Sequence, residues 1–165
     1  MYKLVLFLAS AVVIMALHAI QIDREASVHV LFRAKDAVNR AAHAAALQLD
    51  PFLLSEGVYA IDPLEAERMA RFYLQENLKL DAGLQPLPGS FLQSEAEWLV
   101  FDVVNGDRSF PYTYEHETYD FEAVLYRPGV VLMVRIEYPR TYAFLPPISW
   151  VVKSVAEITA LPAAP

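Results

Sequence analysis

The chain has 165 residues, a formal net charge of −7, 56% hydrophobic residues and no cysteine. This length accommodates one domain and an anchor. The negative charge and the lack of a basic stripe argue against nucleic acid as a partner, because phosphate binding requires clustered Lys and Arg. Without cysteine the chain has neither disulfides nor thiolate ligands for a metal.

Residues 1–22 are almost entirely apolar, and no charged residue lies between Lys3 and Asp23. About 20 helical residues span roughly 30 Å, the thickness of the hydrocarbon core of a bilayer. The positive-inside rule places Lys3 in the cytoplasm and exports the chain beyond residue 22. We therefore expect a single-pass anchor in the cell membrane, in contact with the lipid bilayer, and an extracytoplasmic C-terminal domain.

A cleaved signal peptide and a buried core helix are the alternatives for this segment. The apolar run is longer than a signal-peptide core of about 7–15 residues. Its best cleavage candidate, Leu17-His18-Ala19, places leucine where a small residue is preferred. An uncleaved anchor therefore fits better than a signal peptide, and the residues that follow argue against a core helix.

Residues 23–50 are predicted to continue the same helix. The stretch from Ala26 to Leu49 is rich in alanine and contains neither glycine nor proline, and alanine is the strongest helix former. Pro51 disfavours helical geometry at Asp50, so the helix is expected to end there.

At 100° per residue this helix has two faces. The helix-packing face comprises Val30, Ala34, Ala37, Val38, Ala41 and Ala45. The opposite, polar face carries His29, Arg33, Asp36, Arg40 and His43, with Asp36 spaced to pair with both arginines. The alanine-rich face is expected either to cover the domain's own sheet or to pack laterally on other helices in an assembly, and both uses are compatible along different lengths.

Residues 51–160 are predicted to form an α+β head, followed by a frayed tail at 161–165. Asp62-Pro63-Leu64-Glu65 has the residues of a helix start, and the helix is expected to run to about Leu80, with a stop at 81–83. Period-two alternation then predicts strands near 99–103, 108–114, 119–125, 130–138 and 148–158. With Asn105-Gly106 as a hairpin turn, they form a 4–5-stranded antiparallel sheet in meander order.

The densest group of ligand-type residues is Glu115-His116-Glu117, followed by Asp120 and Glu122. It falls at an expected strand turn, so we interpret it as an exposed hairpin tip, with cation binding as the alternative. His29, Asp36 and His43 recur every seven residues, about 10.5 Å along a helix, which is too far for one ion to touch two of them. They are interpreted as a solvated face.

No nucleophile elbow, phosphate-binding loop or dinucleotide fingerprint occurs. The sequence therefore predicts a protein that is not an enzyme, with no catalytic residue, no cofactor and no metal.

The apolar segment is followed by the run from Phe32 to Asp50, FRAKDAVNRAAHAAALQLD. This arrangement resembles the Arg/Ala-rich run after the membrane helix in TadE/TadG-like pilus assembly proteins of the type IV pilin-like superfamily. The resemblance covers about a third of the chain. It implies a long helix, membrane-embedded in its first half, that carries a small β-rich head and contacts other pilus or pseudopilus subunits or copies of itself.

Two features of pilin-like subunits are missing here. No glycine or similar small residue precedes the apolar run, and no glutamate lies near its start. The expected function is therefore that of a bacterial, membrane-anchored, exported accessory (minor pilin-like) structural subunit of a Tad-type or pseudopilus-like assembly. The alternative is a bitopic extracytoplasmic sensor or binding module with the helix as a tether.

Overall fold

The computed structural model describes residues 2–140 and 146–159. The predicted tail at 161–165 lies outside these residues. The order of elements is one long helix, two shorter helices and five strands, with a short 3-10 turn between the second and third strands. The α+β class predicted from the sequence is confirmed.

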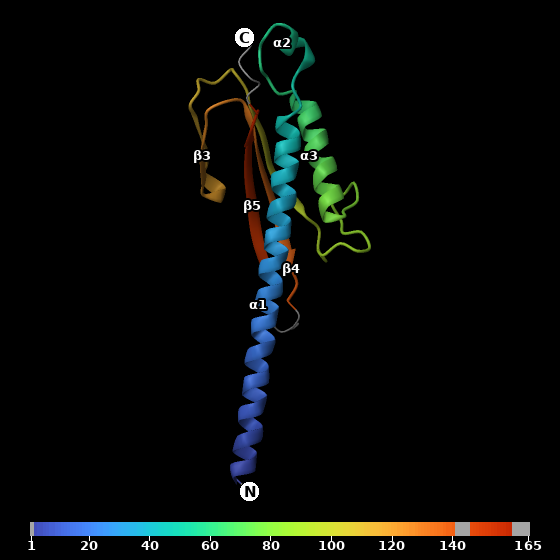
Figure 1. Ribbon diagram of the computed structural model, residues 1–165, viewed down its shortest axis with the longest axis vertical. Coiled ribbons are helices and arrows are strands. Elements are labelled where there is room, and N and C mark those ends of the chain that lie inside the picture. The colour runs from blue at the N-terminus through green and yellow to red at the C-terminus, as the bar shows by residue number, and fades with distance from the viewer. Residues whose placement is uncertain (1, 141–145, 160–165) are drawn as a thin grey trace.

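The first helix, α1 (Tyr2–Ala46), is continuous over 45 residues. Its first half extends away from the head, and its second half lies along the sheet (Figure 1). The predicted end at Asp50 is wrong by four residues. Gln48 accepts from the Asp62 amide at 2.8 Å and the Asp50 amide donates to the Ala60 carbonyl at 2.9 Å, so pairing with a distant segment replaces the last helical turn.

A short helix that the sequence analysis missed, α2 (Pro51–Ser55), follows at once. The Asp50 side chain accepts from the amides of Phe52 and Leu53, and Pro51 takes the first helical position. The same cap begins α3 (Pro63–Leu78), where the Asp62 side chain accepts from Leu64 and Glu65, as predicted. This helix ends at Lys79, which adopts a left-handed φ of 54°, before the expected stop at 81–83.

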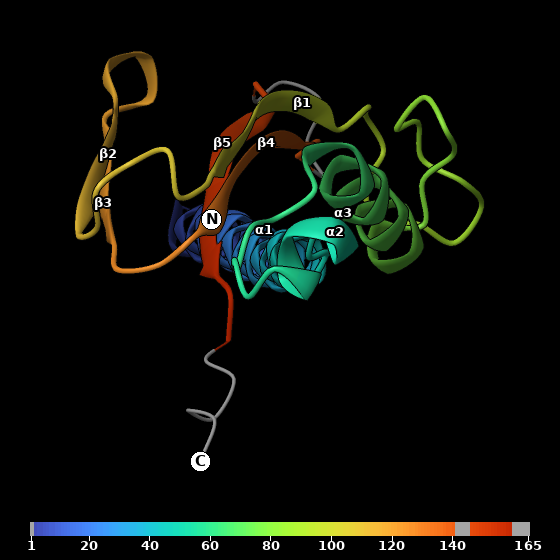
Figure 2. The same ribbon diagram turned by 90° about the horizontal axis from the view of Figure 1, so that it is seen from above.

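The strands form two antiparallel sheets. The larger has the order β1-β4-β5, from β1 (Glu97–Val104), β4 (Gly129–Tyr138) and β5 (Ile148–Glu157). The smaller pairs β2 (Tyr112–His116) with β3 (Phe121–Leu125) across the 3-10 turn η1 (Glu117–Tyr119). Viewed from above, this hairpin lies on the opposite side of the head from α3 (Figure 2).

The predicted meander and the hairpin turn at Asn105-Gly106 are wrong, because β1 pairs with β4 and not with β2. The Asn105 side chain accepts from the Ile61 amide at 2.8 Å and donates to the Ile61 carbonyl at 2.9 Å. These two bonds attach the end of β1 to the segment before α3. The chain then leaves the large sheet, and the strand expected at 108–114 forms instead at β2.

The central strand β4 is buried on both faces. Val130, Leu132, Val134 and Ile136 face the main core between the sheet, α1 and α3. Val131 and Met133 face a second core, which β2 and β3 cover. Burial on both faces explains why this strand is almost continuously apolar.

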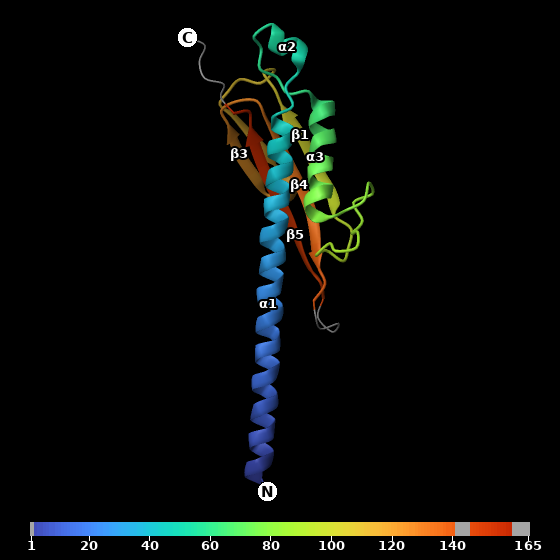
Figure 3. The same cartoon turned by 45° about the vertical axis from the view of Figure 1, so that its right-hand side comes forward.

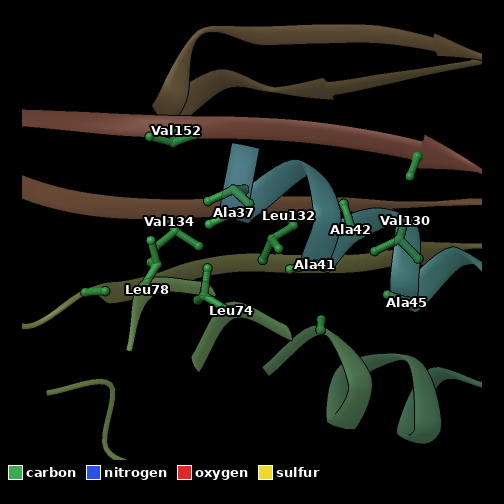
Figure 4. Close-up of a cluster of buried hydrophobic side chains, with 14 of the residues drawn as sticks. Ala37, Ala41, Ala42, Ala45, Leu74, Leu78, Val130, Leu132, Val134 and Val152 are labelled. Atoms are coloured by element: carbon green, nitrogen blue, oxygen red, sulfur yellow. The ribbon is translucent and has the colours of Figure 1, made fainter. Parts of the chain in front are cut away.

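Alanines of α1 allow the helix to lie close to the sheet. Figure 4 shows Ala37, Ala41, Ala42 and Ala45 beside Val130, Leu132 and Val134, with Leu74 and Leu78 of α3 closing the same cluster. Of the two uses proposed for the alanine-rich face, the structure shows packing on the chain's own head.

Ala41→Leu tests this close packing. Ala41 is fully buried in the main core, and extra methyl groups in a filled core cost about 1–3 kcal/mol. We expect that loss in chemical denaturation of the full-length protein in detergent. Ala16→Leu adds the same atoms to an exposed part of α1 and should leave the midpoint unchanged. Equal midpoints for both variants would contradict the packing described.

Candidate functional site

The apolar first half of α1, residues 2–22, is not covered by the described part of the head. Its most apolar 18-residue window is 0% buried, and among the described residues α1 is the one helix long and apolar enough to cross a membrane. A soluble core helix buries such a surface. The length, composition and exposure of this half of α1 therefore support a single-pass association with a bilayer. Figure 3 shows this half extending below the head as a straight continuation of the buried half.

The residues predicted as a helix-packing face lie inside the head. Ala34, Val38, Ala41 and Ala45 are fully buried and Ala37 is 3% exposed, while Val30 is partly buried beside them. Their neighbours come from α3, β4 and β5. An assembly contact made by α1 above the membrane would thus use its outer flank, where Val28 and Phe32 are exposed.

Asp23 marks the point where α1 leaves the head. Its side chain is 1% exposed and lies 3.7 Å from Nη1 of Arg140. The hydroxyl of Tyr138 donates to its Oδ1 at 3.3 Å. The structure turns Asp23 inward, although it directly follows the apolar segment. The carboxylate ties α1 to the end of β4 at the boundary of the apolar half.

A cleft of about 470 Å³ lies between α1, α3 and the loop at 79–91. We call it the basic cleft, because its charged lining consists of three cations and one carboxylate: Arg33, Arg40, Lys79 and Asp36.

The predicted pairing of Asp36 with Arg33 and Arg40 does not form among the described residues. The Arg33 guanidinium lies over the ring of Phe91, 5.8 Å from its centroid. Nη1 of Arg40 donates to Oδ1 of Asn77 at 3.2 Å. Residues of α3 and the following loop thus hold both arginines through uncharged groups. Sequence reasoning missed this cleft, because its residues come from segments about 40 positions apart.

The cluster around residues 115–122 is an exposed hairpin tip, as predicted. We call its four exposed carboxylates, Glu115, Glu117, Asp120 and Glu122, the acidic tip. Lys153 of β5 donates to the carbonyl oxygens of Tyr119 and Asp120, the latter at 3.1 Å, and so holds the turn against the large sheet.

Among the described residues, no three His, Cys, Asp or Glu side chains are grouped as a metal site would require. His29, Asp36 and His43 are all exposed on α1, which confirms their interpretation as a solvated face.

A polar pair connects the second core to an exposed residue of β1. Tyr114 is buried and donates its hydroxyl to Asp102 of β1. Burial, followed by the hydrogen bond and the charge of Asp102, raises the pKa of the Tyr114 phenol above its usual value. The pair joins β2 to β1 and has a structural role. Its partners belong to different sheets, so the sequence pattern did not reveal it.

Comparisons with protein-family models, with characterised proteins and with solved structures found no match.

Asp23→Ala tests the attachment of α1 to β4. The substitution leaves the Arg140 guanidinium partly buried without this carboxylate, and breaking a buried pair costs about 3–5 kcal/mol. Because the Arg140 side chain retains 28% exposure, we expect the lower end, about 3 kcal/mol. Hydrogen exchange should show faster opening of α1 next to the junction. Arg24→Ala, at an exposed neighbour, is the control, and equal exchange in both variants would refute the attachment.

Tyr114→Phe tests the polar pair through pH. Loss of the hydrogen bond should cost about 1 kcal/mol at neutral pH. In the native protein the folded pKa is raised, so the unfolded state loses its proton first and stability falls as pH rises above about 10. The variant lacks this phenol, and its stability should fall less steeply in that range. Urea midpoints measured from pH 7 to 11 check both effects, and parallel curves would contradict them.

Proposed function

We propose that this chain is a membrane-anchored, exported accessory subunit, minor pilin-like, of a Tad-type or pseudopilus-like assembly. In this role it acts through helix packing and protein–protein contact and not through catalysis. The observation that carries the proposal is the continuity of α1 from an unburied apolar half of bilayer length into the core of the head.

The continuity of α1 matters because no flexible linker separates its apolar half from the head. A sensor or binding module attached to a membrane needs only a tether, and a flexible linker suffices for that. Here a single helix is packed against α3, β4 and β5 above residue 30 and is anchored to β4 at Asp23. The head therefore has a defined orientation relative to the bilayer, which is useful where subunits must be placed in register.

The outer flank of α1 offers the contact surface for a neighbouring helix. Val28 is 40% exposed and Phe32 is 60% exposed, one turn apart on the same side of the helix. Large apolar side chains at this spacing form a ridge that fits between the side chains of another helix. We infer that α1 contacts other subunits, or copies of itself, through this ridge and through residues 2–22.

Photo-crosslinking in native membranes tests this proposal. A benzophenone amino acid replacing Phe32 should give adducts of higher mass, with a second copy or with another membrane subunit. The control places the same probe at Tyr126, which is 68% exposed on the loop after β3. Monomer alone from position 32 would contradict the proposal.

Exchange of the anchor separates the two functional readings. Residues 2–22 are replaced by an unrelated apolar helix of equal length, with Asp23 onward unchanged. An assembly role predicts that the adducts at position 32 are lost while the chain stays in the membrane fraction. Adducts that persist unchanged would show that residues 2–22 act only as a tether, which is what the binding-module alternative expects of them.

A further inference from the structure

Two surfaces of opposite charge are left without ion pairs. In the basic cleft, Arg33, Arg40 and Lys79 make no ion pair within 4.0 Å among the described residues. The four carboxylates of the acidic tip are likewise outside every ion pair of the described chain. Each of the two surfaces therefore keeps a net charge that a surface of the opposite sign can meet.

The cations of the basic cleft are held in place without being neutralised. The ring of Phe91 positions Arg33, and the amide of Asn77 positions Arg40. Lys79 is placed by its left-handed φ of 54°, with its ammonium next to Gly89, where an added Cβ would come within 3.2 Å of Nζ. The three cations outnumber Asp36, the one carboxylate of the cleft lining, and a docked anionic group would meet a net positive charge there.

The two surfaces cannot meet within one molecule. The β2–β3 hairpin lies on one side of the head and the loop at 79–91 on the other (Figure 2). Along the long axis, however, the turn η1 just before β3 and this loop lie at about the same level (Figure 1). Copies anchored in one bilayer share that axis and height. A tip on one copy is thus level with the cleft on a copy beside it.

We propose that the acidic tip of one copy docks into the basic cleft of a neighbouring copy in the same membrane. This inference rests on the proposed assembly role and deepens it by naming the partner and the two surfaces. Because the surfaces differ, the contact is head-to-tail and continues from copy to copy. Each copy carries a formal charge of −7, so copies repel at long range and the cleft supplies the local attraction.

Cysteine crosslinking between full-length chains tests the contact, since the chain contains no cysteine. Leu87→Cys labels the loop beside the cleft, and Thr118→Cys labels the tip at η1; both positions are exposed. Membranes that contain both single-cysteine chains, with different epitope tags, should give a mixed dimer with a short bismaleimide. Each chain alone should give far less dimer, because a head-to-tail contact does not bring identical positions together.

Charge reversal and a compensating reversal test whether the contact depends on attraction between opposite charges. Arg33→Glu with Arg40→Glu, placed in the Leu87→Cys chain, should lower the yield of mixed dimer about tenfold, as expected from losing several exposed ion pairs. Glu115→Lys with Glu117→Lys in the Thr118→Cys chain should restore it. Glu56→Lys, at an exposed residue beyond α2, is the control and should leave the yield unchanged.

The outcomes separate this contact from the wider assembly role. The docking is overturned if the mixed dimer is absent, or if its yield is the same with and without charge reversal. If Phe32 adducts persist in those membranes, the proposed function stands without it. A mixed dimer that is lost on reversal and restored by the compensating pair supports the docking. Replacement of the mixed dimer by adducts with acidic proteins other than this chain would overturn self-docking in favour of another partner.

Discussion

The structure depends on a single helix, α1, whose two halves lie in different surroundings. Over residues 2–22 α1 presents apolar side chains outward, as a bilayer requires, while above residue 30 it presents alanine inward to the sheet. The second requirement is steric, because the close approach of α1 to β4 leaves room for little more than a methyl group at Ala34, Ala41 and Ala45. α3 then completes the core against the same helix and the same sheet face. Without the small side chains of α1, neither the sheet nor α3 could close this core.

The change between the two surroundings takes place at Asp23. A carboxylate is costly to bury unless it is paired, and here Tyr138 and Arg140 at the far end of β4 lie beside it. The helix therefore enters the head at a defined residue and does not slide along it. This point also links the membrane segment to the sheet, since β4 is the central strand to which β1 and β5 both pair. Movement of α1 in the membrane would be transmitted to the middle of the head and not to its edge.

Local signals predicted α1, α3, β4 and β5 well. Alanine content, the Asp62-Pro63 cap and period-two alternation each act within a few residues. The same cap at Asp50-Pro51 begins α2, but the sequence pattern does not separate so short a helix from the end of α1 a few residues before it. The sequence pattern does not reveal pairings between residues that are far apart in the chain. β1 pairs with β4 because Asn105 binds Ile61, 44 positions away, and the chain departs from the sheet there. The burial of Asp23 depends on Tyr138, 115 positions later, and the basic cleft depends on α1 and α3 lying side by side. No sequence window contains both partners of such contacts.

The β2–β3 hairpin carries the exposed carboxylates at its tip and covers Val131 and Met133 at its base. In an antiparallel ladder successive side chains alternate between faces, and Tyr114 and Leu125 must point inward to keep that cover. Tyr112 pairs with Leu125, and Tyr114 pairs with Ala123 one inward-facing level closer to the tip. Adding one residue to each strand between these two levels would place Tyr114 and Leu125 on opposite faces, whereas adding two would keep both inward and carry the tip further out. Within this part of the hairpin, the reach of the tip can change only in steps of two residues per strand, about 7 Å each.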